Sequence, residues 1–245
     1  MPFEPIIRTV GLSGLLVSFA DAMSEPANRA ALAFRAAVES EEWPEVQEIS
    51  MSLVSVYIVA DLVVCDIAAL TARIETLLET RDWNSAPLPQ GRTLWHVPTV
   101  YGTDLAPQLE ETATAAGMDA DEAVKQLSSA RVRVLTIGFA PGQPYLGELD
   151  PVWNIPRQQA LTQSVPAGAL VTAIRQLIIF TAATPTGWRH IGQTGFRLFQ
   201  PRTASPFALR VGDELSFPAI SRAEFETIIS RDASGRGGAE QEALP

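Results

Sequence analysis

Glycine and proline crowd particular stretches of the second half of this chain, and this feature constrains its fold most. Residues 138–147 read GFAPGQPYLG, residues 165–168 read VPAG, and Gly187 follows a further proline by two positions. Glycine reaches positive φ angles and proline fixes φ, so such stretches favour tight turns. After Arg131 the chain therefore reads as short strands divided by turns, a pattern typical of a closed or nearly closed β-barrel.

The first 84 residues show a different pattern, in which strands alternate with amphipathic helices. Residues 6–20 and 44–60 are rich in β-formers, and apolar residues recur at helical spacing over 25–38 and again over 66–80. We therefore expect a small α+β domain over residues 1–84, followed by a proline-rich linker.

The barrel domain is expected over residues 92–220. It opens with a strand over 92–100 and continues with a helix over 104–116 and a short helix over 119–128, before the β-rich remainder. The tail, residues 221–245, is rich in glycine and charge. Its low apolar content predicts a mobile C-terminal arm outside the barrel.

Composition excludes several classes of function. The net charge is −10 and no basic run occurs, which argues against a nucleic-acid partner. No apolar run approaches the length of a membrane span, and the N-terminus lacks the pattern of a secretory signal, so we expect a cytoplasmic protein with no membrane partner. The two histidines lie far apart without cysteine or histidine neighbours, so no metal site is expected.

Three polar residues among the turns are candidates for ligand binding. The planar fork of Arg157 suits a carboxylate, and the alternative is a surface arginine that packs over Trp153. Gln176 lies in an apolar strand, where its amide faces either the barrel or a ligand. His190 could act as an acid or base near neutral pH, but no partner carboxylate or nucleophile is visible in the sequence.

Aromatic residues in the same segments have two interpretations. Phe139, Tyr145 and Trp188 are either core residues or the lining of a pocket. No residue is assigned a catalytic role. The predicted substrate-binding set consists of Phe139, Pro141, Gly142, Gln143, Tyr145, Arg157, Gln176, Trp188, His190 and Thr194.

The order of these motifs resembles one protein family. GFAPGQPYLG, Pro156-Arg157, VPAG, Gly187-Trp188 and Ile191-Gly192-Gln193-Thr194 resemble, in that order, segments of the allophanate hydrolase subunit 1 family. This family includes the B subunit of bacterial 5-oxoprolinase and a sporulation-kinase inhibitor. The resemblance implies a cyclophilin-like barrel, whereas periodicity alone does not distinguish that barrel from others.

The resemblance also implies a function. It points to a subunit of an ATP-dependent hydrolase complex that acts on carbon–nitrogen bonds of a small amide or lactam, as in 5-oxoprolinase or allophanate hydrolase. ATP would be used by the assembled complex. The partner implied is a second homologous subunit, of the allophanate hydrolase subunit 2 type, and together the two would shape a site for a small carboxylate or amide substrate.

Departures from the family pattern keep two alternatives open. Leu127 stands where relatives usually carry a histidine, Leu161-Thr162 where they repeat Pro-Arg, and Gln193 where they carry an arginine. These losses favour a non-catalytic regulatory protein that binds a histidine kinase or another partner. A carboxyltransferase-like component of a biotin-dependent system is the second alternative.

Overall fold

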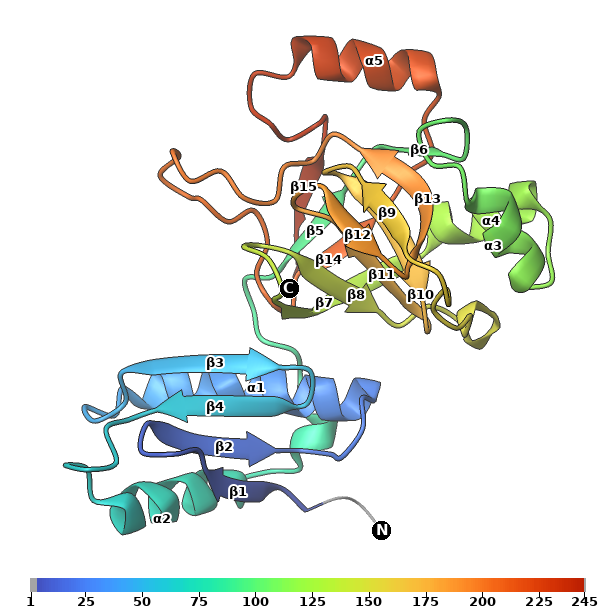
Figure 1. Cartoon of the computed structure of the whole chain (residues 1–245). Helices are drawn as coiled ribbons and strands as arrows, with labels where there is room; N and C mark the ends of the chain where they lie inside the picture. Colours follow the sequence, from blue (N-terminus) through green and yellow to red (C-terminus); the bar gives the residue numbers. More distant parts are fainter. Residues whose placement is uncertain (1–3, 245) are drawn as a thin grey trace. The chain divides into compact units, whose positions relative to one another are not determined.

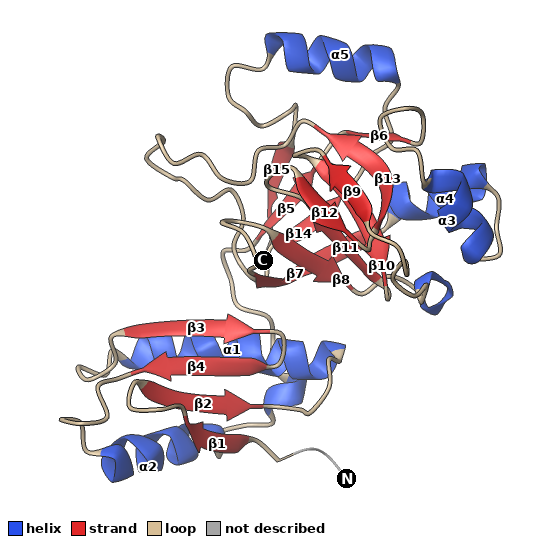
Figure 2. Ribbon diagram, in the orientation of Figure 1, coloured by secondary structure: helices blue, strands red, loops and turns tan. Residues whose placement is uncertain are grey.

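The chain forms two compact units, residues 1–90 and 91–245, and the boundary along the sequence falls within the proline-rich linker. Figure 1 shows the computed structural model, which describes residues 4–244, and Figure 2 shows its helices and strands. Each unit has its own sheet and its own buried core. The first is mixed α+β and the second is mainly β, as the sequence predicted.

The first unit is a four-stranded antiparallel sheet with two helices. Its strand order is β1-β2-β4-β3, and β2 and β4 bury alternate residues such as Leu15, Val17, Val56 and Ile58. The two-residue period therefore places one apolar face against the helices. The elements are β1 (Ile6–Thr9), β2 (Gly14–Ser18), α1 (Glu25–Glu41), β3 (Glu48–Ser52), β4 (Ser55–Val59) and α2 (Ile67–Leu78).

Side-chain caps begin both helices of this unit. The Ser24 hydroxyl accepts a hydrogen bond from the Ala27 amide at 3.4 Å, and the Asp66 carboxylate accepts one from the Ala69 amide at 3.0 Å. Phe34 of α1 is fully buried, and its ring contacts that of Trp83 edge to face at 5.2 Å. Trp83 lies in a short 3-10 turn, η1 (Trp83–Ser85), which closes the unit before the linker.

The second unit is built on a curled nine-stranded sheet with the order β15-β5-β14-β7-β8-β11-β10-β13-β6. A two-stranded ribbon, β12-β9, is separate from this sheet. The strands are β5 (Thr93–His96), β6 (Thr99–Tyr101), β7 (Arg131–Ile137), β8 (Pro144–Gly147), β9 (Thr162–Val165), β10 (Ala169–Ala173), β11 (Gln176–Ile179), β12 (Thr184–Thr186), β13 (Arg189–Thr194), β14 (Glu214–Ser216) and β15 (Glu240–Ala243).

The sheet curls back on itself at Pro98. The predicted strand over 92–100 is two strands, β5 and β6, because proline has no amide hydrogen with which to continue the ladder. Strand β5 pairs in parallel with β14, and beyond the break Thr99 forms a parallel bridge to Ala219. Strand β5 lies next to one end of the sheet and β6 forms the other end, and the short segment through Pro98 joins them. The sheet must therefore curve like a barrel.

Alternate residues of the central strands β10 and β11 enter two different cores. Leu170, Leu177 and Ile179 belong to the interior of the barrel, together with Trp95, Tyr101 and Phe217 among others. Their neighbours form a smaller outer core, whose members are Val165, Ala169, Val171, Ala173, Ile178, Phe180 and Trp188. Because both faces of these strands are buried, their sequences are mostly apolar and do not alternate between apolar and polar residues.

Two short helices follow β6. They are α3 (Leu109–Ala115) and α4 (Ala120–Ser129), and the Asp119 side chain caps α4 by accepting a bond from the Glu122 amide at 2.8 Å. The prediction of a helix from residue 104 was wrong, since α3 begins five residues later. Gly102 and Thr103 both have positive φ angles, and Pro107 interrupts the backbone bonding, so residues 102–108 form turns. A further 3-10 turn, η2 (Pro151–Trp153), follows β8.

The C-terminal segment is part of the second unit and not a separate arm. It forms a helix, α5 (Arg222–Arg231), and then β15, which pairs with β5 in the main sheet. Apolar content did not predict this strand because its four side chains are all exposed and it is held by backbone bonds. Among residues 4–244, no helix is long and apolar enough to cross a membrane.

Candidate functional site

A β-bulge in β13 brings two buried polar side chains to one face of the sheet. Along β10, Leu170 pairs with Gly192 but Val171 pairs with His190, so one extra residue is inserted in β13. Residues three apart on a regular strand point to opposite faces, whereas the bulge lets His190 and Gln193 point the same way. Both side chains line one groove, and they are only 4% and 8% exposed.

This groove has a volume of about 650 Å³ and is lined by both polar and apolar residues. The lining residues come from β9 and the turn that follows it, from β13, from the turns after β6 and from α5. Its lining residues are Asp104, Leu105, Pro107, Gln108, Thr162, Ser164, Pro166, His190, Gln193 and Phe225. We call this cavity the β13 groove.

Two glutamines, Gln108 and Gln158, link the segments around the β13 groove by hydrogen bonds. The Gln108 amide nitrogen donates to Oε1 of Gln158 at 2.8 Å, while its own Oε1 accepts the backbone N–H of His190 at 2.9 Å. The Gln158 side chain in turn donates to the carbonyl of Trp188 at 3.0 Å and to the Thr162 hydroxyl at 3.3 Å. This network fixes the backbone around His190, because each amide has partners on two different segments.

The orientation of the Gln193 amide follows from its partners. Its Nε2 donates to the carbonyl of Ala167 at 2.9 Å and to that of Thr194 at 3.1 Å. A flipped amide would set Oε1 against two carbonyl oxygens, so Oε1 must face the other way. Gln193 Oε1 and His190 Nε2 are both buried without a hydrogen-bond partner within the described chain.

Burial keeps His190 neutral. Loss of solvation lowers the pKa of its imidazole below the ordinary value, and the nearby Gly192 and Gln193 oppose that shift. Since Gln193 Oε1 has no hydrogen bond, its carbonyl acts on the ring as a nearby dipole. A neutral imidazole offers one N–H donor and one acceptor nitrogen, which suits recognition of a polar, uncharged group.

The Asp104 carboxylate at the rim of the groove is already paired. Arg222 donates to it, and this hydrogen bond lowers the pKa of Asp104 below its usual range. Arg222 also bonds to Glu226 at 2.9 Å, so the guanidinium serves two carboxylates. The residues lining the groove include no lysine or arginine.

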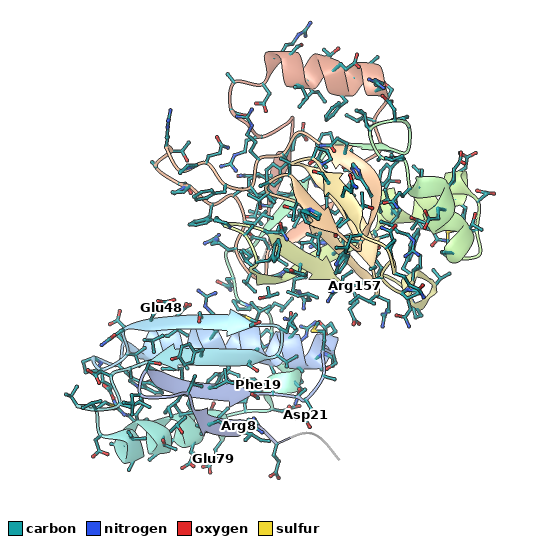
Figure 3. All side chains as sticks on the ribbon, in the orientation of Figure 1. Arg8, Phe19, Asp21, Glu48, Glu79 and Arg157 are labelled. Carbon is teal, nitrogen blue, oxygen red and sulfur yellow. The ribbon has the colours of Figure 1, made fainter. Side chains whose placement is uncertain are left out.

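Three of the predicted residues form a separate aromatic cluster. The Tyr145 and Trp188 rings meet edge to face at 6.4 Å, and the guanidinium of Arg157 lies 5.1 Å from the centre of the Trp188 ring. Arg157 therefore packs over Trp188, and the alternative interpretation, in which it packs over Trp153, was wrong. Figure 3 labels Arg157 at the edge of the second unit. All three residues lie outside the β13 groove.

The turn between β7 and β8 holds four predicted residues away from the groove. Phe139 has a positive φ and is 75% exposed, and Pro141 is also exposed. Gly142 has φ +74°, and a Cβ there would lie 3.1 Å from the Leu198 carbonyl oxygen. Gln143 is buried, with its Oε1 unpartnered within the described residues. This turn packs on the 198–207 segment rather than on β13.

The last two predicted residues are placed apart from His190. Gln176 begins β11 and faces Ala173 in a tight hairpin, half-buried. Thr194 donates to the Gly168 carbonyl at 3.3 Å and lines a second cavity of about 420 Å³, beneath α5. Of the ten predicted residues, only His190 lines the β13 groove.

Sequence reasoning missed the residues that accompany His190. Gln108, Gln158 and Gln193 lie on three segments, and no spacing rule links them. The one signal in the sequence is the substitution at Gln193, which by itself indicates only the loss of an arginine. The bulge that directs Gln193 into the groove leaves no mark in the sequence.

Comparison with known proteins places the chain in a family. The family described as carboxyltransferase domain, subdomain C and D, matches residues 5–209. The chain belongs to this carboxyltransferase-domain family. The match covers most of both units, and it confirms the expectation drawn from the motif order.

The similar curated proteins carry one name. The chain is 27% identical to the B subunit of 5-oxoprolinase from Bacillus subtilis (strain 168), over 89% of this chain and 94% of that protein. It is 35% identical to the B subunit of 5-oxoprolinase from Escherichia coli O157:H7, over 59% of this chain and 66% of that protein. The expected link to allophanate hydrolase has no support from these relatives.

Solved structures share the fold. TTHA0988 is 28% identical with a TM-score of 0.69, and the match covers 88% of this chain but 40% of that one, so this chain spans about two fifths of its length. The Kluyveromyces lactis urea carboxylase has a TM-score of 0.72 at 18% identity, covering 98% of this chain and 24% of that one. This second likeness shows the fold alone and agrees with a cyclophilin-like barrel.

Proposed function

We propose that this chain is a subunit of a 5-oxoprolinase-type complex and shapes one wall of a small-molecule site. The observation that carries the proposal is the β13 groove, where two buried polar atoms lack partners within the described residues. The relatives named as the B subunit of 5-oxoprolinase support the same assignment. An unpartnered buried polar group is costly to stability, so each one calls for an explanation such as a bound ligand or water. The substrate class is a small amide or lactam, and the complex would hydrolyse its carbon–nitrogen bond.

The second wall would come from a homologous barrel subunit. The name of the relatives implies an assembly of different chains. ATP would be used by the complex, but the groove does not fit a triphosphate. Its lining has no lysine or arginine to neutralise phosphate, so we assign no nucleotide contact to this groove.

Co-expression with a candidate second subunit tests this proposal. We expect the two chains to co-purify at a fixed ratio and to hydrolyse 5-oxoproline only when ATP is present. Gln108→Leu would break the network around His190 and lower the rate, while Gln163→Leu, on the exposed side of β9, should not. A stable pair that lacks this activity, or no pair at all, would refute the proposal.

A regulatory role is the second candidate function. The polar side chains around the groove are largely bonded to one another, as in the chain from Gln108 through Gln158 to Thr162, which favours holding a partner over performing chemistry. A histidine-kinase partner would be identified by reduced autophosphorylation when this chain is added. Unchanged autophosphorylation, with the complex active, would remove this candidate.

A further inference from the structure

Two residues that line the β13 groove, Gln193 and His190, each hold a buried polar side-chain atom that lacks a hydrogen-bond partner within residues 4–244. Gln193 Oε1 can only accept a hydrogen bond, and its orientation is fixed by the two bonds that its Nε2 donates. His190 Nε2 belongs to a ring that burial keeps neutral, so with hydrogen on Nε2 it donates one bond. Neither atom has a partner among the described residues.

We propose that the β13 groove binds an uncharged amide group and rejects a carboxylate. An amide N–H would donate to Gln193 Oε1, and the amide carbonyl would accept from His190 Nε2–H. One planar group would therefore give a hydrogen bond to each of the two unpartnered atoms. A carboxylate carries only acceptors. It would set a negative oxygen against Gln193 Oε1 and leave that atom unsatisfied.

The charges around the groove act in the same direction. The lining contains one carboxylate, Asp104, and no cation. Two arginines that bond to or adjoin lining residues have other partners. Arg222 bonds to Asp104 and Glu226, and Arg189 bonds to Glu111 at 3.0 Å and to the Pro156 carbonyl at 2.6 Å. An anionic ligand would therefore enter without a countercharge.

Entry of the amide requires a small rearrangement. Both orphan atoms are shielded from solvent, and Phe225 is the lining residue that comes from α5. None of the residues of α5 is buried, so α5 is the part of the lining that moves at least cost. Displacement of Phe225 would widen the groove on the side of the second cavity, which it also lines.

This inference deepens the proposed function by naming the part of the substrate that this chain holds. It rests on that function only for the claim that the bound amide belongs to the substrate. In the complex, the lactam amide of 5-oxoproline would lie in the β13 groove and its carboxylate would lie outside it.

The test titrates the full chain with propionamide and with propionate, which match in size and differ in charge. The chain has two histidines, so NMR of the ring nitrogens gives two sets of signals. The His96→Gln variant shows which set belongs to His96. The His190 signals then report binding, and the His96 signals serve as the internal control. Propionamide should shift the His190 signals saturably and leave those of His96 unchanged. The affinity for propionate should be lower than that for propionamide by a factor of about ten or more.

Two variants check the assigned atoms. Gln193→Met keeps the volume of the side chain but removes the acceptor, and should abolish the propionamide shift. Gln193→Arg should reverse the preference in favour of propionate. Unchanged His96 signals and circular dichroism would show that each variant is folded. Phe225→Ala should tighten propionamide binding by removing the cover.

Several outcomes would overturn the inference. These are propionate binding as tightly as propionamide, a propionamide shift that survives Gln193→Met, and no propionamide shift in either the wild type or Phe225→Ala. A separate titration with 5-oxoproline distinguishes the two proposals. If propionamide shifts His190 and 5-oxoproline does not, the amide site stands and the proposed substrate fails.

Discussion

Gly168 shows at the scale of one residue how closely the strands around the site approach. It has φ +79°, and a Cβ at this position would lie 2.3 Å from the carbonyl oxygen of Thr194 in β13. The turn from Pro166 to Gly168 therefore needs both the left-handed backbone and the missing side chain. The same turn supplies the Ala167 carbonyl that orients Gln193.

Gly168→Ala should consequently lower the free energy of unfolding by about 2 to 4 kcal/mol, because strain and a backbone clash act together. The matched control is Gly138→Ala, since Gly138 has no left-handed φ and no atom near the position of a Cβ. Urea denaturation of both variants checks this expectation. Equal stability of the two variants would show that the close approach to Thr194 is not rigid.

His190 makes stability depend on pH in a defined direction. Burial lowers the pKa of its ring in the folded state, so the unfolded chain binds the proton more readily. The stability that comes from keeping His190 neutral is full above the unfolded pKa, roughly 6.5, and is lost as the pH falls toward the lowered folded value.

The free energy of unfolding should therefore fall in the wild type as the pH drops from about 7 to about 5. His190→Gln should show a shallower fall, because the substituted side chain does not titrate. Denaturation curves at several pH values measure these slopes. A slope that is unchanged in His190→Gln would assign the pH dependence to other groups.

Strand β15 shows at the scale of an element how a segment without apolar side chains joins a sheet. The Leu244 amide donates to the Arg92 carbonyl at 2.9 Å, and hydrogen-bonded pairs alternate along an antiparallel ladder. Glu242 lies two residues before Leu244 and opposite Leu94, so its N–H also points toward β5. The N–H of Gln241, which lies opposite Trp95, points away from β5.

A proline scan of β15 should follow this alternation. Glu242→Pro removes an amide that bonds to β5 and should detach the strand, at a cost of about 1 to 3 kcal/mol. Gln241→Pro places the same residue where no ladder bond is lost, and should cost less. Amide hydrogen exchange of β5 reports the difference. Equal protection of β5 in both variants would contradict the assigned register.

The two units show at the scale of the whole molecule how much of the chain can fold by itself. Each has a complete sheet and a buried core, and the division falls at a linker of proline, glycine and polar residues. All residues that line the β13 groove belong to the second unit.

Residues 91–245 should accordingly fold when expressed alone, because no strand of their sheet lies in the first unit. We expect cooperative unfolding of this fragment and His190 ring signals at the positions found in the full chain. Residues 1–90 serve as the matching fragment. A fragment 91–245 without dispersed NMR signals would show that the barrel depends on the first unit.

The sequence by itself determined the two-part organisation, the helices of the first unit and the β-rich character of the second. These follow from local causes, since the caps of Ser24 and Asp66 and the turns near Gly142 and Gly168 act within a few residues. The order of motifs also predicted the family, which the match over residues 5–209 confirmed.

Only the tertiary structure decided the site. His190 and Gln193 share a face because of one extra residue in β13, and Gln108 bonds to the His190 backbone from a turn 82 positions earlier. The same holds for β15, whose pairing with β5 depends on backbone amides that every residue carries. Register and long-range pairing are set by the whole sheet, so residue types along the chain do not reveal them.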